Sequence, residues 1–128
     1  MKPKTLAWIK IADNDLMVAK DNFKDGHYAH AAYLCHQTIE KYLKAAVQEL
    51  TNEIPLHTHN FNTLLEAAGL RPPEDIEEKI LRLAPHYIPT RYPEELEKLQ
   101  EQYTKEATQK YLEDTEQIIL WLKKNYLK

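Results

Sequence analysis

The sequence predicts an all-α fold, an antiparallel up-and-down bundle of about five helices with a four-helix core. Apart from Pro3 and Gly26, all prolines and glycines lie between residues 55 and 93: residues 4–54 contain no proline and a single glycine, and residues 94–128 contain neither. In both long blocks apolar residues recur every three or four positions, and no segment shows the period-2 alternation of a strand. With 128 residues and no linker-like tract, the chain is expected to form a single domain, residues 1–128.

The first helix is expected over about residues 6–23, where apolar residues follow a 3-4-3-4 spacing. Thr5 is its expected N-cap, and Asp25-Gly26 provides the stop. The second helix is expected over about residues 27–50. Its apolar stripe is broad, which predicts a central helix, and consists of Tyr28, Ala32, Cys35, Ile39, Tyr42 and Ala46.

Three further helices are expected in the second half of the chain. A short one follows Asn60, a good N-cap, and stops at Gly69. The fourth opens at Pro73, because a missing N–H costs nothing in the first turn, and Pro85 ends or kinks it. The fifth is expected from about residue 95 or 104 to residue 124.

Composition excludes several classes of function. The 17 basic and 20 acidic residues give a net charge of −3, so any contact with nucleic acid must be a local site. Two glycines exclude Gly-rich phosphate loops, one cysteine excludes a disulfide framework, and the absence of serine excludes a serine nucleophile. No apolar run approaches the ~18 residues of a membrane span, and no secretory h-region follows Met1. We therefore expect a cytoplasmic protein without a membrane segment.

The second helix carries the first candidate site. Lys41 and Lys44 lie one turn apart and could together hold a phosphate as two point charges, with Gln37 and Glu40 as supporting polar residues. The alternative is a solvated helix face on which Glu40 and Lys44 form an i,i+4 pair worth ~0.3 kcal/mol.

Histidine spacing is compatible with a metal site but does not favour one. The pairs His57/His59 and His36/Glu40 have usable spacings, yet no HExxH motif exists, and His59 could simply belong to the start of the third helix. We expect no metal and no cofactor. Cys35 lies on the apolar stripe, which favours an inert core thiol over a nucleophile.

The proline-rich residues 87–93 form the second candidate site. Two prolines stiffen this segment, so that Arg91 could meet a phosphate bidentately and Tyr92 could stack on a base. The alternative is a stiff connector whose Tyr92 packs on the bundle. Arg82 and His86, one turn apart with Pro85 between them, are weak candidates for a phosphate-binding cation and a general acid or base.

Three segments occur in order along the chain. They are Gly26-His27-Tyr28 with Ala31-Ala32 and residues 36–45, Thr58-His59-Asn60-Phe61 with Leu64-Leu65, and Tyr87-Ile88-Pro89-Thr90-Arg91-Tyr92-Pro93. Together they resemble the signature of the HEPN family over about residues 6–125. The resemblance implies a cytoplasmic prokaryotic bundle of about five helices, usually a homodimer, often encoded beside a small nucleotidyltransferase. Some such pairs are toxin–antitoxin systems whose HEPN partner cleaves RNA without metal, and others bind nucleotide or assist the partner.

Carried over by motif, the resemblance points to three groups of residues. Gln37, Glu40, Lys41 and Lys44 fall on the second-helix block, His59 on the next, and Arg91, Tyr92 and Pro93 on the last. The family's ribonuclease motif, an arginine followed after four to six residues by histidine, is not intact. No histidine follows Arg91, and only three residues separate Arg82 from His86.

These observations lead to three hypotheses about function. The first is a non-enzymatic, dimeric module that binds a nucleotide or RNA through Lys41, Lys44, His59, Arg91 and Tyr92 and acts with a nucleotidyltransferase. The second is a metal-independent ribonuclease toxin of a toxin–antitoxin pair, using Arg82 and His86 or Arg91. The third is a purely protein–protein interaction or dimerisation module.

Overall fold

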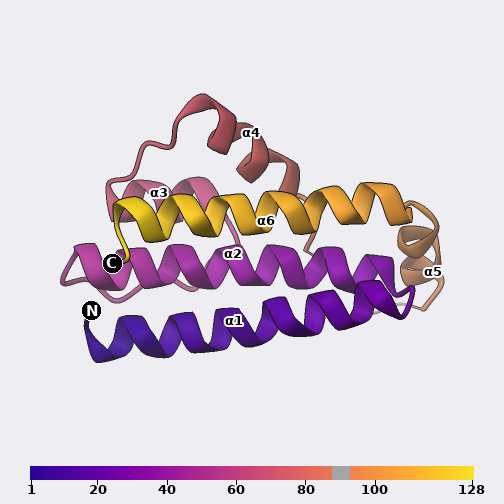
Figure 1. Ribbon diagram of the computed structural model, residues 1–128, viewed down its shortest axis with the longest axis horizontal. Coiled ribbons are helices and arrows are strands. Elements are labelled where there is room, and N and C mark those ends of the chain that lie inside the picture. The colour runs from indigo at the N-terminus through magenta and orange to yellow at the C-terminus, as the bar shows by residue number, and fades with distance from the viewer. Residues whose placement is uncertain (88–92) are drawn as a thin grey trace.

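The computed structural model describes residues 1–87 and 93–128, except for the side chains of Leu96 and Leu99. Within these residues the secondary structure is helical and includes no strand, which confirms the all-α prediction (Figure 1). The helices are α1 (Pro3–Lys24), α2 (Tyr28–Leu50), α3 (Phe61–Ala68), α4 (Glu74–Leu83), α5 (Pro93–Glu101) and α6 (Lys105–Asn125). In the described part of the chain, no helix is both long and apolar enough to cross a bilayer.

Helix α2 lies at the centre of the molecule, between α1 and α6, as its broad apolar stripe predicts (Figure 1). Helix α1 runs antiparallel to α2, and the ion pair between Asp15 and Lys41 joins them near their middles. Helix α6 runs in the same direction as α2, so that Tyr42 lies beside Lys123. This parallel pairing is possible because three intervening helices return the chain to the start of α2.

More residues of α2 are buried than its apolar stripe alone predicts. Fourteen of its 23 residues are buried, including His36, Glu40 and Lys44 on its polar side. Helices α3 and α4 cover that side, so it is not the solvated face that a simple amphipathic pattern suggests. The candidate site therefore lies between α2 and this cover.

The start of α1 differs from the sequence prediction. Thr5 is not its N-cap, because the helix begins earlier, with Pro3 in its first turn and Lys2 at the N-cap position. Thr5 is instead fully buried inside the helix, and its hydroxyl donates a hydrogen bond of 2.9 Å to Glu49 Oε1 on α2. A threonine just ahead of an apolar pattern can serve either role, and here the tertiary partner decides.

The ends of α3 follow the local chemistry that the sequence predicts. The Asn60 side chain accepts a hydrogen bond of 3.1 Å from the Thr63 N–H and caps the helix. Gly69 ends it in the left-handed conformation, with φ of 70°, which a side chain would disfavour. Helix α4 ends at Leu83, two residues before Pro85.

The last expected helix is divided into α5 and α6. The Thr104 hydroxyl accepts a hydrogen bond of 3.1 Å from the Ala107 N–H, so a new helix begins at Lys105. Both starting points that the sequence left open therefore correspond approximately to real helix starts, at Pro93 and at Lys105.

Candidate functional site

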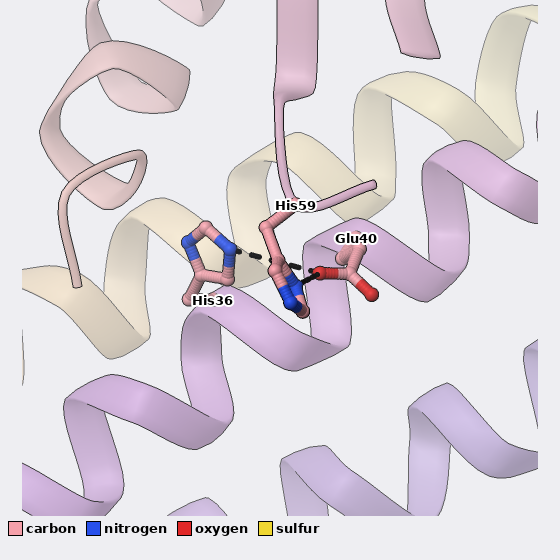
Figure 2. Close-up of side chains that lie close together, drawn as sticks. All are labelled: His36, Glu40 and His59. Atoms are coloured by element: carbon pink, nitrogen blue, oxygen red, sulfur yellow. Dashed lines mark hydrogen bonds and ion pairs between the residues drawn. The ribbon is translucent and has the colours of Figure 1, made fainter. Parts of the chain in front are cut away.

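The candidate site is centred on the buried carboxylate of Glu40. Its Oε2 accepts a hydrogen bond of 3.1 Å from Lys44 Nζ, as the i,i+4 pairing predicts. Its Oε1 lies 2.5 Å from His59 Nδ1 and 3.8 Å from His36 Nε2. Figure 2 shows His36 and Glu40 on successive turns of α2, with the His59 ring reaching them from the segment before α3.

His36 is completely buried and held in one orientation. Its Nδ1 lies 3.0 Å from the backbone oxygen of Leu83 at the end of α4. Its ring stacks on Phe61, with 4.4 Å between the ring centroids. Burial lowers the pKa of His36 below its ordinary value. Its Nε2 has no hydrogen-bond partner among the described residues.

The segment that carries His59 is shaped by its neighbours on both sides. The Thr58 hydroxyl accepts a hydrogen bond of 3.0 Å from the Asn60 N–H, and Asn60 in turn caps α3. These two local bonds hold the backbone around His59 and direct its ring toward Glu40. The spacing of residues 58–60 thus positions His59, which does not lie on a helix.

His59 and Tyr87 form an exposed aromatic surface beside an open pocket. Their rings are nearly parallel, at 12°, with 5.5 Å between the centroids. The His59 side chain is 59% exposed, and Tyr87 is 42% exposed. The pocket has a volume of about 380 Å³, and its lining consists of Thr58, His59, Asn60, Phe61, Asn62, Ile80, Leu81, Ala84 and Tyr87. It combines an apolar wall from α4 with hydroxyl and amide groups from the loop.

The other predicted residues of α2 are engaged in separate contacts. Lys44 is only 8% exposed, and its ammonium group lies 5.6 Å from the centre of the Trp8 ring. Lys41 forms an ion pair with Asp15 on α1, away from Glu40. The two lysines thus have different carboxylate partners. Gln37 donates a hydrogen bond of 2.5 Å to the hydroxyl of Tyr33.

Arg82 and His86 are each occupied by a different partner. The Arg82 guanidinium donates two hydrogen bonds, of 2.8 and 3.0 Å, to the buried carboxylate of Asp114, which raises the pKa of Arg82. His86 Nδ1 lies 2.8 Å from the hydroxyl of Tyr103, and burial lowers the pKa of His86. The two side chains therefore do not share a partner.

Arg91, Tyr92 and Cys35 are the other candidate residues. Arg91 and Tyr92 lie outside the described residues, so their predicted role in binding stays a prediction. Cys35 is fully buried in the core, and burial raises the pKa of its thiol to about 12, which agrees with an inert core thiol.

Sequence reasoning missed three members of this cluster. His36 was recognised only as an i,i+4 partner of Glu40, and Phe61 and Tyr87 were not singled out as its neighbours. The sequence signal for His36 was its position one helical turn before Glu40. The contact with His59 depends on a return of the chain over 19 residues, which helical spacing alone does not reveal.

Comparison with known proteins finds relatives that span nearly the whole chain. The HEPN domain family model matches residues 5–126. A protein of Methanocaldococcus jannaschii named "Putative toxin MJ1304" is 33% identical and aligns over 88% of this chain and 81% of its own length. The crystal structure of ST0689, an archaeal HEPN homologue, is 29% identical with a TM-score of 0.76, covering 97% of this chain and 98% of that one. TT1696 from Thermus thermophilus is 26% identical in sequence, and its crystal structure superposes with a TM-score of 0.78. The match covers 96% of this chain and 98% of that one.

Proposed function

This chain belongs to the HEPN domain family, and from that premise we propose that it binds a nucleotide or short RNA and acts with a nucleotidyltransferase partner. In this proposal the chain performs no reaction of its own. The observation that carries it is the exposed stack of His59 and Tyr87 at the rim of the 380 Å³ pocket.

The pocket suits a planar base. An exposed aromatic ring provides a stacking surface that accepts any base, at ~1–3 kcal/mol per stacked base. Asn60 and Asn62 offer amide groups that can donate and accept hydrogen bonds at a base edge, while Ile80 and Leu81 contribute apolar contact. A ligand seated there would contact residues of the loop before α3 and of α4 at the same time.

The phosphate of such a ligand needs a cation, and we propose Arg91 for that role. It follows Tyr87 by four residues in the sequence, and its guanidinium suits bidentate phosphate contacts. His59, whose side chain is exposed, lies at the same pocket. Lys41 and Lys44 contribute in this proposal only by exchanging their carboxylate partners, Asp15 and Glu40, for the phosphate.

The test is thermal unfolding of the purified chain against a panel of nucleotides and a short RNA. A ligand at ~1,000 times its Kd adds about 4 kcal/mol of stability, which raises the Tm visibly. We expect a selective shift that is lost in Arg91→Ala and in Tyr87→Ala and is retained in Tyr87→Phe. The matched control is Arg71→Ala, because Arg71 is exposed and does not line this pocket.

Two results would contradict the proposal. A shift that survives Arg91→Ala and Tyr87→Ala would place the ligand elsewhere on the molecule. No shift with any ligand would favour the hypothesis of a protein–protein interaction module.

The name of the M. jannaschii relative supports a second candidate, a ribonuclease toxin. In the described structure Arg82 and His86 are each bound to another residue, which speaks against their acting together on RNA. The toxin hypothesis predicts growth arrest when the chain is expressed without its genomic neighbour, and rescue by His86→Ala. Unimpaired growth at full expression would contradict it.

A dimer and a protein partner remain part of the proposal. Several large apolar side chains on the long helices are about half exposed, among them Leu6 and Met17 on α1 and Leu120 on α6. Exposed apolar groups of this kind are suited to an interface. Light scattering of the purified chain, and co-purification with the product of the adjacent reading frame, measure both associations directly.

A further inference from the structure

We propose that His36, Glu40 and His59 form a binding site for a divalent transition-metal ion such as Zn²⁺. One ligand atom from each residue lies within 4.8 Å of the other two. Figure 2 shows both imidazole rings directed at the same carboxylate. This inference goes beyond nucleotide binding and does not depend on it.

The orientation of His36 is the first argument for a metal ion. A backbone carbonyl only accepts hydrogen bonds, so the 3.0 Å contact with Leu83 requires a proton on Nδ1 of His36. In the neutral ring, Nε2 is then a bare lone pair. It is buried and has no hydrogen-bond partner among the described residues, and the atom it faces, Glu40 Oε1 at 3.8 Å, is also an acceptor. A cation between them would satisfy both acceptors.

The donor set is the second argument. Two imidazole nitrogens and one carboxylate oxygen are a ligand set that holds zinc with an open coordination position. Bonds of about 2.1 Å around a tetrahedral ion place ligand atoms ~3.4 Å apart. The two contacts of Glu40 Oε1, 2.5 Å to His59 and 3.8 Å to His36, lie on either side of that value. The exposed His59 side chain can adjust, while His36 and Glu40 are fixed on one helix.

The groups behind the ligands have the arrangement that metal sites use. The Leu83 carbonyl fixes the tautomer and orientation of the His36 ring. Lys44 holds the second oxygen of Glu40, at 3.1 Å, and leaves the first oxygen to the two histidines. The positive charge of Lys44 opposes a cation, so the site should be weaker than one without this ammonium group.

The ion would also lie at the edge of the pocket, because His59 belongs both to the cluster and to the pocket lining. With three protein ligands, the remaining coordination is left to water or to an oxygen of a bound molecule. This would supply positive charge in a chain whose two nearby lysines are already paired.

The experiment is a calorimetric titration of the full chain, free of any affinity tag and stripped with EDTA, with Zn²⁺. We expect one equivalent to bind. His59→Gln should weaken binding by more than the ~10–100-fold typical for loss of an outer-shell partner. The matched control is His57→Gln, since His57 is an exposed histidine two residues away that takes no part in the cluster. This variant should bind as the wild type does.

Binding of Co²⁺, followed by its visible absorption, adds a readout of coordination. The absorption of bound Co²⁺ should be lost in His59→Gln and kept in His57→Gln. The proposal is wrong if the wild type binds no stoichiometric ion, or if His57→Gln weakens binding as much as His59→Gln does. His59→Gln carries the test because its side chain is exposed, whereas a variant of the buried His36 could fail to fold. No nucleotide is present, so failure here leaves the nucleotide proposal untouched.

Discussion

Arg82 and Asp114 are joined by two hydrogen bonds, of 2.8 and 3.0 Å, that connect α4 to the middle of α6. The two partners differ in environment, because the Asp114 side chain is fully buried and that of Arg82 is 38% exposed. Asp114 therefore occupies the guanidinium of Arg82, which the spacing to His86 had made a weak candidate for binding phosphate. It also holds α4 against the bundle.

The difference in burial predicts unequal costs for removing the two partners. Arg82→Met should lower the free energy of unfolding by ~3 kcal/mol, because a buried carboxylate loses its main partner. Asp114→Asn should cost less, since Arg82 can turn to solvent and the amide oxygen still accepts a hydrogen bond. Urea denaturation measures both. Equal costs, or a larger cost for Asp114→Asn, would contradict this account.

The complete burial of Cys35 predicts a thiol that does not react in the folded protein. A chromogenic disulfide reagent at neutral pH should leave the thiol of the native chain almost unlabelled. After denaturation it should label one equivalent. Rapid labelling without denaturant would show that the α2–α6 contact opens readily.

The fold was largely predictable from the sequence because its determinants are local. Gly69 and Pro85 act through their own backbone geometry, and Asn60 acts through a side-chain hydrogen bond to Thr63, three residues away; α3 and α4 begin or end beside them. Thr5 was misassigned because its role depends on Glu49, which lies 44 residues away along the chain. Local patterns predict a cap there, and only packing shows the tertiary hydrogen bond.

The candidate site was predictable only in part for the same reason. The i,i+4 pair of Glu40 and Lys44 follows from helical spacing. The burial of that pair does not, because it depends on residues far away along the chain: Trp8 of α1 lies beside Lys44, and His59 lies beside Glu40. Two lysines one turn apart therefore suggested a shared phosphate site, whereas they contact two different carboxylates.

His86 predicts a dependence of stability on pH. Its ring packs against those of Tyr103 and Tyr111, with Arg82 one turn away. Burial, and to a smaller extent the charge of His36, hold the pKa of His86 below the ordinary 6.5. The unfolded chain therefore binds a proton at a higher pH than the folded one does. Stability from this group is complete above about pH 6.5 and is lost as the pH falls through the interval between the two pKa values.

The measurement is urea unfolding between pH 7.5 and pH 5, in EDTA, of the wild type and of His86→Gln. We expect the wild type to lose stability toward acid and the variant to lose less, because glutamine does not titrate and can still bond to the Tyr103 hydroxyl. Identical pH profiles would mean that His86 takes up its proton equally well in both states.

The two lysines of α2 provide the last prediction, because their ion pairs differ in burial. Lys44 and Glu40 are 8% and 4% exposed, so Lys44→Met leaves a buried carboxylate without its ammonium partner and should cost ~3 kcal/mol of unfolding free energy. The Lys41 and Asp15 side chains are 22% and 16% exposed, and Lys41→Met should cost ~1 kcal/mol, since Asp15 can turn to water.

A double variant separates charge from packing in this prediction. Adding Glu40→Gln to Lys44→Met removes the unpaired charge, so we expect it to recover a large part of the loss in urea denaturation with EDTA present. The alternative result is that the double variant loses as much unfolding free energy as Lys44→Met and Glu40→Gln lose in sum. Lys44 would then stabilise the fold through its contact with Trp8 rather than through Glu40. Equal costs for Lys41→Met and Lys44→Met would show that burial does not distinguish the two pairs.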